Sequence, residues 1–156
     1  MRRLFVAVLL VALAMPAWGQ YGKRAGSADA EFKALIDRYC QLWSSANPDN
    51  AAPFYAKDAD LVFYDLAPMK YTGWAEYKAG VQKTFFDNME SGKLTAKDDL
   101  KVNRHGNWAW TTVSGHLSAK MKNGQAVEAD YRHTAIWEKS GGKWVIVHEH
   151  LSVPMP

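Results

Sequence analysis

The sequence contains a single cysteine, Cys40, among its 156 residues. One cysteine cannot form an intramolecular disulfide, so packing alone must hold the fold together. A reactive thiol would need surroundings that lower its pKa, and the residues around Cys40 indicate none. We therefore expect Cys40 to be a small buried apolar side chain.

Several functional motifs are also missing. The chain has no Gly-rich phosphate loop, no Ser-His-Asp order, no Cys-His nucleophile pair and no cluster of basic residues, and its formal net charge is only +3. These absences argue against nucleotide cofactors, nucleophilic hydrolases and nucleic-acid binding. We expect no cofactor, no nucleic-acid partner and no association with membranes.

The N-terminus has the pattern of a secretory signal peptide. Arg2 and Arg3 precede an apolar run from Leu4 to Met15, and Ala17 and Gly19 supply small residues before a cut at Gln20. A membrane anchor is the alternative, but about 12 apolar residues are too few to span a bilayer. We expect a signal peptide at 1–19, export to the periplasm or medium, a flexible lead-in at 20–28 and one domain at 29–156. Removing residues 1–19 takes away two arginines and lowers the charge from +3 to +1.

The pattern of the remaining residues predicts helices followed by a meander of antiparallel strands. Apolar residues at three- and four-residue steps predict an amphipathic helix from Asp29 to Ala46. The further predicted elements are a short helix over 50–56, a strand over 60–65, a helix over 74–89, and strands over 93–103 and 108–121, the last ending at Asn123-Gly124. This order predicts an α+β fold with helices on one face of a curved antiparallel sheet.

Two strands close the chain, over 127–139 and 143–153, joined by a turn at 140–142. Strict alternation places Trp144, Ile146, His148, His150 and Ser152 on one face of the last strand, and the odd-numbered residues on the other. Both faces carry bulky side chains. We therefore expect helices to cover one face and a second subunit, in a homodimer, to cover the other.

Several short motifs carry a resemblance to a known family. The element order resembles that of the SnoaL-like domains of the nuclear transport factor 2-like, or ketosteroid isomerase-like, superfamily, from about residue 32 to 154. The last two strands are similar to the association domain of the calcium/calmodulin-dependent protein kinases. The motifs are Gly73-Trp74, Thr134-x-x-Trp137, Gly142-Lys143-Trp144 and His148-x-His150-x-Ser152-x-Pro154. The resemblance implies a cone-shaped α+β fold, which hosts isomerases, cyclases, dehydratases, transport factors and assembly hubs.

The resemblance also implies roles for individual residues. Arg38-Tyr39 resembles the isomerase pair whose phenol donates to an enolate oxygen, but the isomerase base falls on Phe63. The nearest carboxylate, Asp65, lies two residues later, about 6.6 Å along the strand, so steroid isomerisation is not expected. The association domain's cavity arginines fall on Gly115, Ala135 and Leu151, so a pocket built for small carboxylates is not expected either.

Both comparisons turn the odd-numbered strand residues into the cone: Val113, Gly115, His133, Ala135, Val147, Glu149 and Leu151. The candidate ligand-binding residues are therefore Tyr39, Asp65, His133 and Glu149, with Trp74 at the pocket mouth. A carboxylate in an apolar cone would have a raised pKa and could exchange a proton with a ligand, with His133 as partner. Alternatively, the two carboxylates lie at a solvated rim and Tyr39 is a core aromatic.

The sequence thus predicts an exported domain that binds a small, mostly apolar ligand, with isomerase- or dehydratase-type proton transfer as the accessible chemistry. The alternative is a non-catalytic oligomerisation or accessory domain acting through the face with Trp144, Ile146, His148 and His150. Whether the protein is an enzyme stays open at this point.

His148 and His150 have the His-x-His spacing on a strand that lets two imidazoles bind one metal ion, and His116 could supply a third ligand. If the turn pairs Lys139 with Lys143, Arg132 lies opposite His150, which is unfavourable for a cation. We expect no metal there, but a polar layer at a subunit interface formed by Arg132, Thr134, His148, His150 and Ser152.

Overall fold

The computed structural model describes residues 25–155, so the predicted signal peptide lies outside the described residues. The elements, in order, are α1 (Ala25–Trp43), α2 (Pro48–Ala51), η1 (Ala52–Phe54), β1 (Val62–Tyr64), β2 (Tyr71–Thr72), α3 (Gly73–Thr84), η2 (Phe86–Asn88), β3 (Met89–Ala96), β4 (Lys101–His105), β5 (Trp108–Met121), β6 (Ala126–Ser140) and β7 (Lys143–Ser152). No helix within residues 25–155 is long and apolar enough to cross a membrane.

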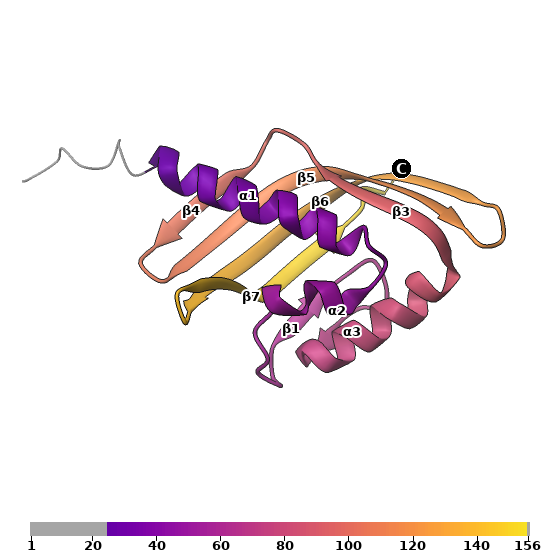
Figure 1. The fold of residues 1–156 in the computed structure, drawn as a ribbon, viewed down its shortest axis with the longest axis horizontal. Helices are drawn as coiled ribbons and strands as arrows, with labels where there is room; N and C mark the ends of the chain where they lie inside the picture. Colours follow the sequence, from indigo (N-terminus) through magenta and orange to yellow (C-terminus); the bar gives the residue numbers. More distant parts are fainter. Residues whose placement is uncertain (1–24, 156) are drawn as a thin grey trace, which may run out of the picture.

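The strands form one curved, open sheet with the helices on one side of it (Figure 1). The strand order is β2-β1-β7-β6-β5-β3, and β4 also pairs with β5. All pairs are antiparallel except β1 with β7, which is parallel. The predicted α+β fold with helices packed on the concave face of a curved sheet is confirmed.

Helix α1 is the principal cover of the sheet. Its buried side chains, Phe32, Ile36, Tyr39, Cys40 and Trp43, recur at helical spacing on one face. Phe32 packs on the sheet between Trp137, at 5.7 Å between ring centroids, and Trp144, at 5.1 Å. The helix begins at Ala25, four residues before the predicted start. Cys40 is buried, as expected.

The hairpin of β6 and β7 contains a β-bulge that the alternation pattern did not predict. Ile136 pairs with His148 while Trp137 pairs with Ile146, so Val147 is the extra residue. The bulge shifts the inward face from even to odd positions. The assignment of Trp144 and Ile146 to the outer face is therefore wrong, since both are buried in the core.

The register of this hairpin also differs from the prediction. The turn consists of Gly141 and Gly142, whose φ values of 56° and 79° suit glycine, and Ser140 pairs with Lys143. The turn and the bulge each shift the pairing by one residue, so Arg132 lies opposite Ser152 and not opposite His150.

Two other boundaries differ. The segment predicted as one strand over 93–103 is two strands, β3 and β4, which pair with successive parts of β5. The helix predicted to run to residue 89 ends at Thr84, and Met89 already belongs to β3. The first residues of β3, among them Met89 and Gly92, therefore become part of the cavity wall.

Candidate functional site

An apolar cavity of about 310 Å³ lies between the helices and the sheet. Its wall combines residues of α1, α3 and η2 with inward-facing residues of β3, β5, β6 and β7. The lining residues are mostly apolar and include Trp43, Val81, Phe85, Phe86, Met89, Leu94, Leu117, Ala119, Met121, Val127 and Leu151. Such a wall favours an apolar ligand, and the few polar groups in it would fix the orientation of that ligand.

Asp65 is the carboxylate in the cavity wall. It follows β1, and its Oδ1 accepts a hydrogen bond from the backbone N–H of Leu66 at 2.6 Å, while Oδ2 accepts one from the hydroxyl of Tyr77 at 3.1 Å. Burial raises the pKa of Asp65 to about 6, against the lowering effect of these donors, and the nearby Glu149 raises it further. A carboxyl group with this pKa can accept a proton near neutral pH and release it again.

Tyr39 brings a phenol to the same cavity from α1. Its hydroxyl makes no hydrogen bond to any other described residue, whereas the hydroxyls of Tyr55, Tyr71, Tyr77 and Tyr131 each make at least one. Burial raises the pKa of Tyr39 well above its ordinary value, and the carboxylates of Glu149 and Asp65 add to the effect. Tyr39 therefore stays protonated and is available to donate a hydrogen bond to a ligand oxygen.

His133 and Glu149 form a buried pair behind Tyr39. Each is almost completely inaccessible, and the Nε2 of His133 lies 3.1 Å from the Oε2 of Glu149. The imidazole of His133 is stacked on the Tyr39 ring, at 4.7 Å and 26° between planes. Neither His133 nor Glu149 lines the cavity. Their contact with the cavity is indirect, through the ring of Tyr39.

Tyr55, which no sequence pattern singles out, completes this buried network. Its hydroxyl donates to the Oε1 of Glu149 at 2.7 Å and accepts from the Nε1 of Trp43 at 3.1 Å. Tyr55 reaches β7 because its backbone forms an isolated parallel bridge with Ile146. Burial, then Glu149, raises the pKa of Tyr55 well above its ordinary value.

Of the five predicted site residues, Tyr39 and Asp65 meet in the cavity and His133 and Glu149 meet beneath it. Trp74 lies apart from the cavity lining. Its ring is stacked on that of Tyr55 at 4.3 Å, and Lys57 covers it with its ammonium group 4.3 Å from the ring. Tyr77, which hydrogen-bonds to Asp65, falls within the predicted helix over 74–89, but helical periodicity does not reveal what its hydroxyl contacts.

On the outer face of the sheet, His148 and His150 lie on either side of Tyr64, with ring centroids 5.5 Å and 5.7 Å from it. The Nδ1 of His148 is 2.7 Å from the carbonyl oxygen of Val62, so this nitrogen carries the proton and donates it. His116 lies farther along the sheet, between Asp130 and Glu128. Across residues 25–155 no group of three or more His, Cys, Asp or Glu side chains has a geometry that could hold a metal ion.

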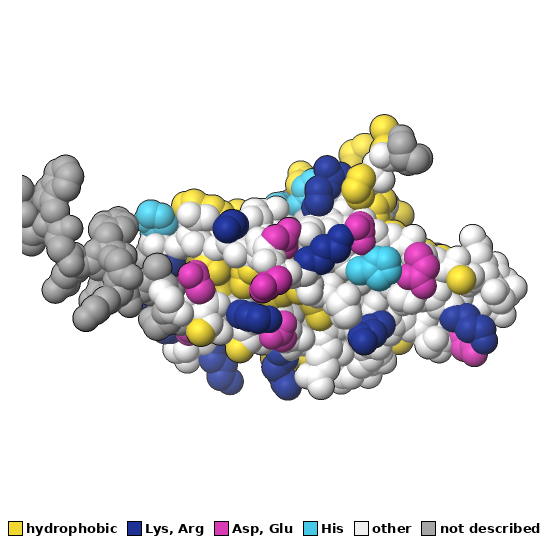
Figure 2. All heavy atoms as spheres, turned by 90° about the horizontal axis from the view of Figure 1, so that it is seen from above, with side chains coloured by type: hydrophobic (Ala, Val, Ile, Leu, Met, Phe, Trp, Pro, Cys, Tyr) yellow, Lys and Arg dark blue, Asp and Glu magenta, His cyan; other side chains and the backbone are white. Residues whose placement is uncertain are grey.

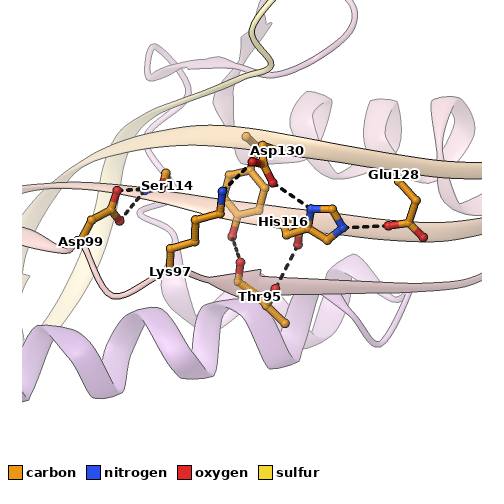
Figure 3. Close-up of polar contacts among 8 residues, drawn as sticks. Thr95, Lys97, Asp99, Ser114, His116, Glu128 and Asp130 are labelled. Carbon is orange, nitrogen blue, oxygen red and sulfur yellow. Dashed lines mark hydrogen bonds and ion pairs between the residues drawn. The ribbon is translucent and has the colours of Figure 1, made fainter.

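The surroundings of His116 form an exposed polar network over β3, β5 and β6 (Figure 3). Both ring nitrogens lie 2.8 Å from carboxylate oxygens, which raises the pKa of His116 above its usual value. Lys97 pairs with Asp130, and Asp99 accepts two hydrogen bonds from Ser114. These charged groups are paired with one another and exposed to solvent, so we interpret the network as a solvated part of the sheet surface.

The curved sheet, the covering helices and the apolar cavity between them define a protein of the nuclear transport factor 2-like cone fold. The family model described as "SnoaL-like domain" matches residues 32–156, and the chain belongs to this family. The resemblance inferred from the sequence is confirmed. The curated proteins include no match to the chain.

Three solved structures illustrate the likeness. A nuclear transport factor 2-like superfamily protein from Salmonella enterica serovar Typhimurium LT2 has 21% identity and a TM-score of 0.72, over 84% of this chain and 94% of that one. A protein from Xanthomonas campestris, named as a proposed calcium/calmodulin-dependent protein kinase II association domain, has 23% identity and a TM-score of 0.69, over 97% and 99% of the two chains. A proposed dehydratase of the same superfamily from Streptomyces avermitilis has 13% identity and a TM-score of 0.70, over 83% and 99%. At these identities the likeness establishes the fold.

Proposed function

We propose that this protein binds a small, mostly apolar ligand in its cavity and transfers a proton beside a carbonyl group of that ligand, as isomerases and dehydratases do. The observation that carries the proposal is the presence of two complementary groups in one apolar cavity. Asp65, whose pKa is about 6, can take a proton, and the unbonded hydroxyl of Tyr39 can donate to the oxygen on which negative charge develops. Neighbours of the same fold that are named as a hydroxylase or dehydratases are consistent with this class of chemistry.

In the proposed step the ionised Asp65 removes a proton from the carbon next to the carbonyl, and the electron pair moves to the carbonyl oxygen. Tyr39 stabilises the resulting enolate by donating a hydrogen bond. Returning the proton to another carbon of an unsaturated ketone completes an isomerisation. Delivering it instead to a hydroxyl group on the neighbouring carbon, which leaves as water while the carbonyl re-forms, completes a dehydration and restores the ionised Asp65. The apolar wall excludes water, which strengthens both interactions.

The test uses 2-tetralone, an uncharged bicyclic ketone, as a probe. In heavy water the protein should accelerate exchange of its α-protons in a saturable manner, and NMR follows the loss of their signals. Asp65→Asn should abolish the acceleration, and Tyr39→Phe should reduce it by about 10² to 10³-fold. If the protein exchanges the protons no faster than buffer does, or if Asp65→Asn exchanges them as fast as the unmodified protein, the proposed proton transfer is wrong.

Binding is tested separately with the uncharged fluorophore N-phenyl-1-naphthylamine. Ala119→Phe should fill the cavity and abolish the fluorescence increase, because Ala119 lines it. Lys120→Phe is the matched control, since Lys120 is the next residue of β5 and is exposed. Equal binding by both variants would place the ligand elsewhere.

The alternative function, a non-catalytic oligomerisation or accessory domain, is favoured by one observation, the exposed Trp110 and Ile136 on the outer sheet face. Under this alternative the probe ketone would not react although the protein would still assemble. We also propose that the chain is exported, on the pattern of residues 1–19. Mass spectrometry of the protein from the exported fraction should then find a chain that begins at Gln20, and an intact N-terminus there would argue against cleavage.

A further inference from the structure

The polar groups of the cavity lie at one of its ends. Tyr39 stacks on His133, and His133 is paired with Leu151 of β7, which also lines the cavity. Asp65 directly follows β1, and the parallel pairing of β1 with β7 ends one residue before Asp65 and Leu151. The phenol of Tyr39 and the carboxyl group of Asp65 therefore share this end, which we call the polar end.

The opposite end of the cavity is apolar. Met89 of β3 is paired with Met121 of β5, and both side chains line the cavity. Phe85 and Phe86, which follow α3, complete this end. All four side chains are half-buried, whereas Tyr39 at the polar end is only 3% exposed. The far part of a ligand can therefore extend toward solvent between apolar side chains at what we call the apolar end.

The distance between the two ends suits an extended chain. Tyr77 hydrogen-bonds to Asp65 at the polar end, and Phe85 lies eight residues later, about 12 Å along the axis of α3. The cavity volume of about 310 Å³ is roughly ten times the volume of one water molecule, which gives room for about ten non-hydrogen atoms. An extended chain of ten atoms spans about 12 Å. Such a chain reaches the whole length, whereas a compact ketone such as 2-tetralone fills only the polar end.

The charges around the cavity favour an uncharged ligand. Lys93 is the single basic residue among the described residues that line it, and Lys93 is paired with Ser118. The neighbouring pair, Gly92 with Ala119, faces the cavity, so the side chain of Lys93 points to the outer face. Figure 2 shows basic and acidic side chains interspersed over the edge formed by β3, β5 and β6, which gives no concentration of positive charge there. A carboxylate at the polar end would be buried beside Asp65 without a cation.

We infer that the ligands of this cavity are medium-chain ketones of about nine to eleven carbon atoms with the carbonyl group near one end. The carbonyl oxygen accepts a hydrogen bond from Tyr39, and the alkyl tail runs toward Met89 and Met121. This inference rests on the proposed function, because it assigns the carbonyl group to the same two residues. Members of this class with a double bond or a hydroxyl group near the carbonyl would be the substrates of isomerisation or dehydration.

A series from 2-hexanone to 2-dodecanone tests the length of the chain by isothermal titration calorimetry. The Kd should fall about fourfold with each methylene group and level off beyond about ten carbons, where the tail reaches solvent. Val127→Phe, at the apolar end, should move the levelling point to shorter chains because Val127 lines the cavity beside Ala119. Ala126→Phe is the matched control, since Ala126 is the preceding residue of β6 and is exposed. Ketones that do not bind, or a Kd independent of chain length, would overturn the inference.

Two ketones of identical composition test the orientation of the chain. Tyr39→Phe should weaken the binding of 2-undecanone about 3- to 10-fold, because its carbonyl group lies near one end and loses a hydrogen bond. The same variant should leave 6-undecanone unchanged, since a carbonyl group in the middle of the chain does not reach Tyr39. Decanoate at pH 8 should bind at least about 30-fold more weakly than 2-undecanone. Equal weakening of both ketones would refute the orientation, and tight binding of decanoate would refute the uncharged ligand class.

Proton exchange in heavy water separates this inference from the proposed function. Binding that depends on chain length, without faster exchange of the α-protons of 2-decanone, would support the ligand class and refute the proton transfer. Faster exchange of 2-tetralone, without a dependence of ketone binding on chain length, would support the proton transfer and refute the ligand class.

Discussion

Replacing Asp65 by asparagine should make the protein more stable at neutral pH, although it should abolish proton transfer. Burial raises the pKa of Asp65 to about 6 in the folded protein, from an ordinary value of 3.8. Between these two pH values the folded state holds a proton that the unfolded state has released. The free energy of unfolding contributed by Asp65 therefore falls as the pH rises through this window. The difference between the two pKa values corresponds to at most about 3 kcal/mol.

Asparagine fits the local contacts and carries no charge. Its side-chain oxygen can still accept from the N–H of Leu66, and its amide group can donate to the hydroxyl of Tyr77, which then acts as acceptor. Urea denaturation followed by tryptophan fluorescence should show Asp65→Asn and the unmodified protein nearly equal at about pH 4, where Asp65 is largely protonated when folded. At about pH 7.5 the variant should be more stable by up to about 3 kcal/mol.

Asp60→Asn, an exposed control, should leave the difference near zero at both pH values. The reasoning is refuted if Asp65→Asn is less stable than the unmodified protein by the same amount at both pH values. Such a result would mean that ionised Asp65 stabilises the fold through its two donors by more than burial costs.

Three other substitutions test the surroundings of the cavity. Tyr77→Phe removes a donor that lowers the pKa of Asp65, so the pH at half-maximal exchange of 2-tetralone should rise above about 6; an unchanged or lower midpoint would contradict this. Glu149→Gln places an amide N–H against one of two buried partners and should cost about 1–3 kcal/mol in urea denaturation, whereas a cost near zero would mean that the network rearranges freely. Gly115→Ala should cost about 1–3 kcal/mol, because a Cβ there would lie 2.1 Å from the ring of Tyr131; a thermal melt unchanged from that of the unmodified protein would show that the ring moves aside.

Regular periodicity made most of the fold predictable. The buried stripe of α1 follows from residues such as Phe32 and Ile36 at helical steps, and the alternation of β5 and β6 correctly turned Val113, His133 and Ala135 inward. These elements are long, and each repeats one pattern without interruption. Local chemistry also located the final turn, because two glycines between β-branched and aromatic runs favour a tight hairpin.

Features that interrupt a pattern could not be predicted in the same way. The bulge at Val147 adds one residue to the strand without any change in the kinds of residue on either side of it. The alternating sequence of β7 therefore looks continuous. Hydrogen bonds between hydroxyl and carboxylate groups that are distant in the sequence could not be predicted either. Tyr55 and Glu149 are 94 residues apart, and only the tertiary fold brings them within hydrogen-bonding distance. The sequence therefore offered Asp65 and Glu149 as candidates, but it did not indicate Tyr55 and Tyr77, whose hydroxyls hydrogen-bond to them.

The bulge at Val147 links the cavity to the outer face. Before it, Ile146 points into the core, and after it Glu149 does so too, although regular alternation would have turned these two residues to opposite faces. Because the shift occurs within one strand, the first half of β7 contributes Ile146 to the core beneath α1. Its second half contributes Glu149, which accepts the hydrogen bond from Tyr55 in the buried network. The same shift leaves His148 on the outer face, where it is paired with Ile136. A regular β7 would either bury His148 and His150 and expose Glu149, or bury Glu149 and expose Trp144 and Ile146, so this single extra residue allows both faces of the sheet to be built from one strand.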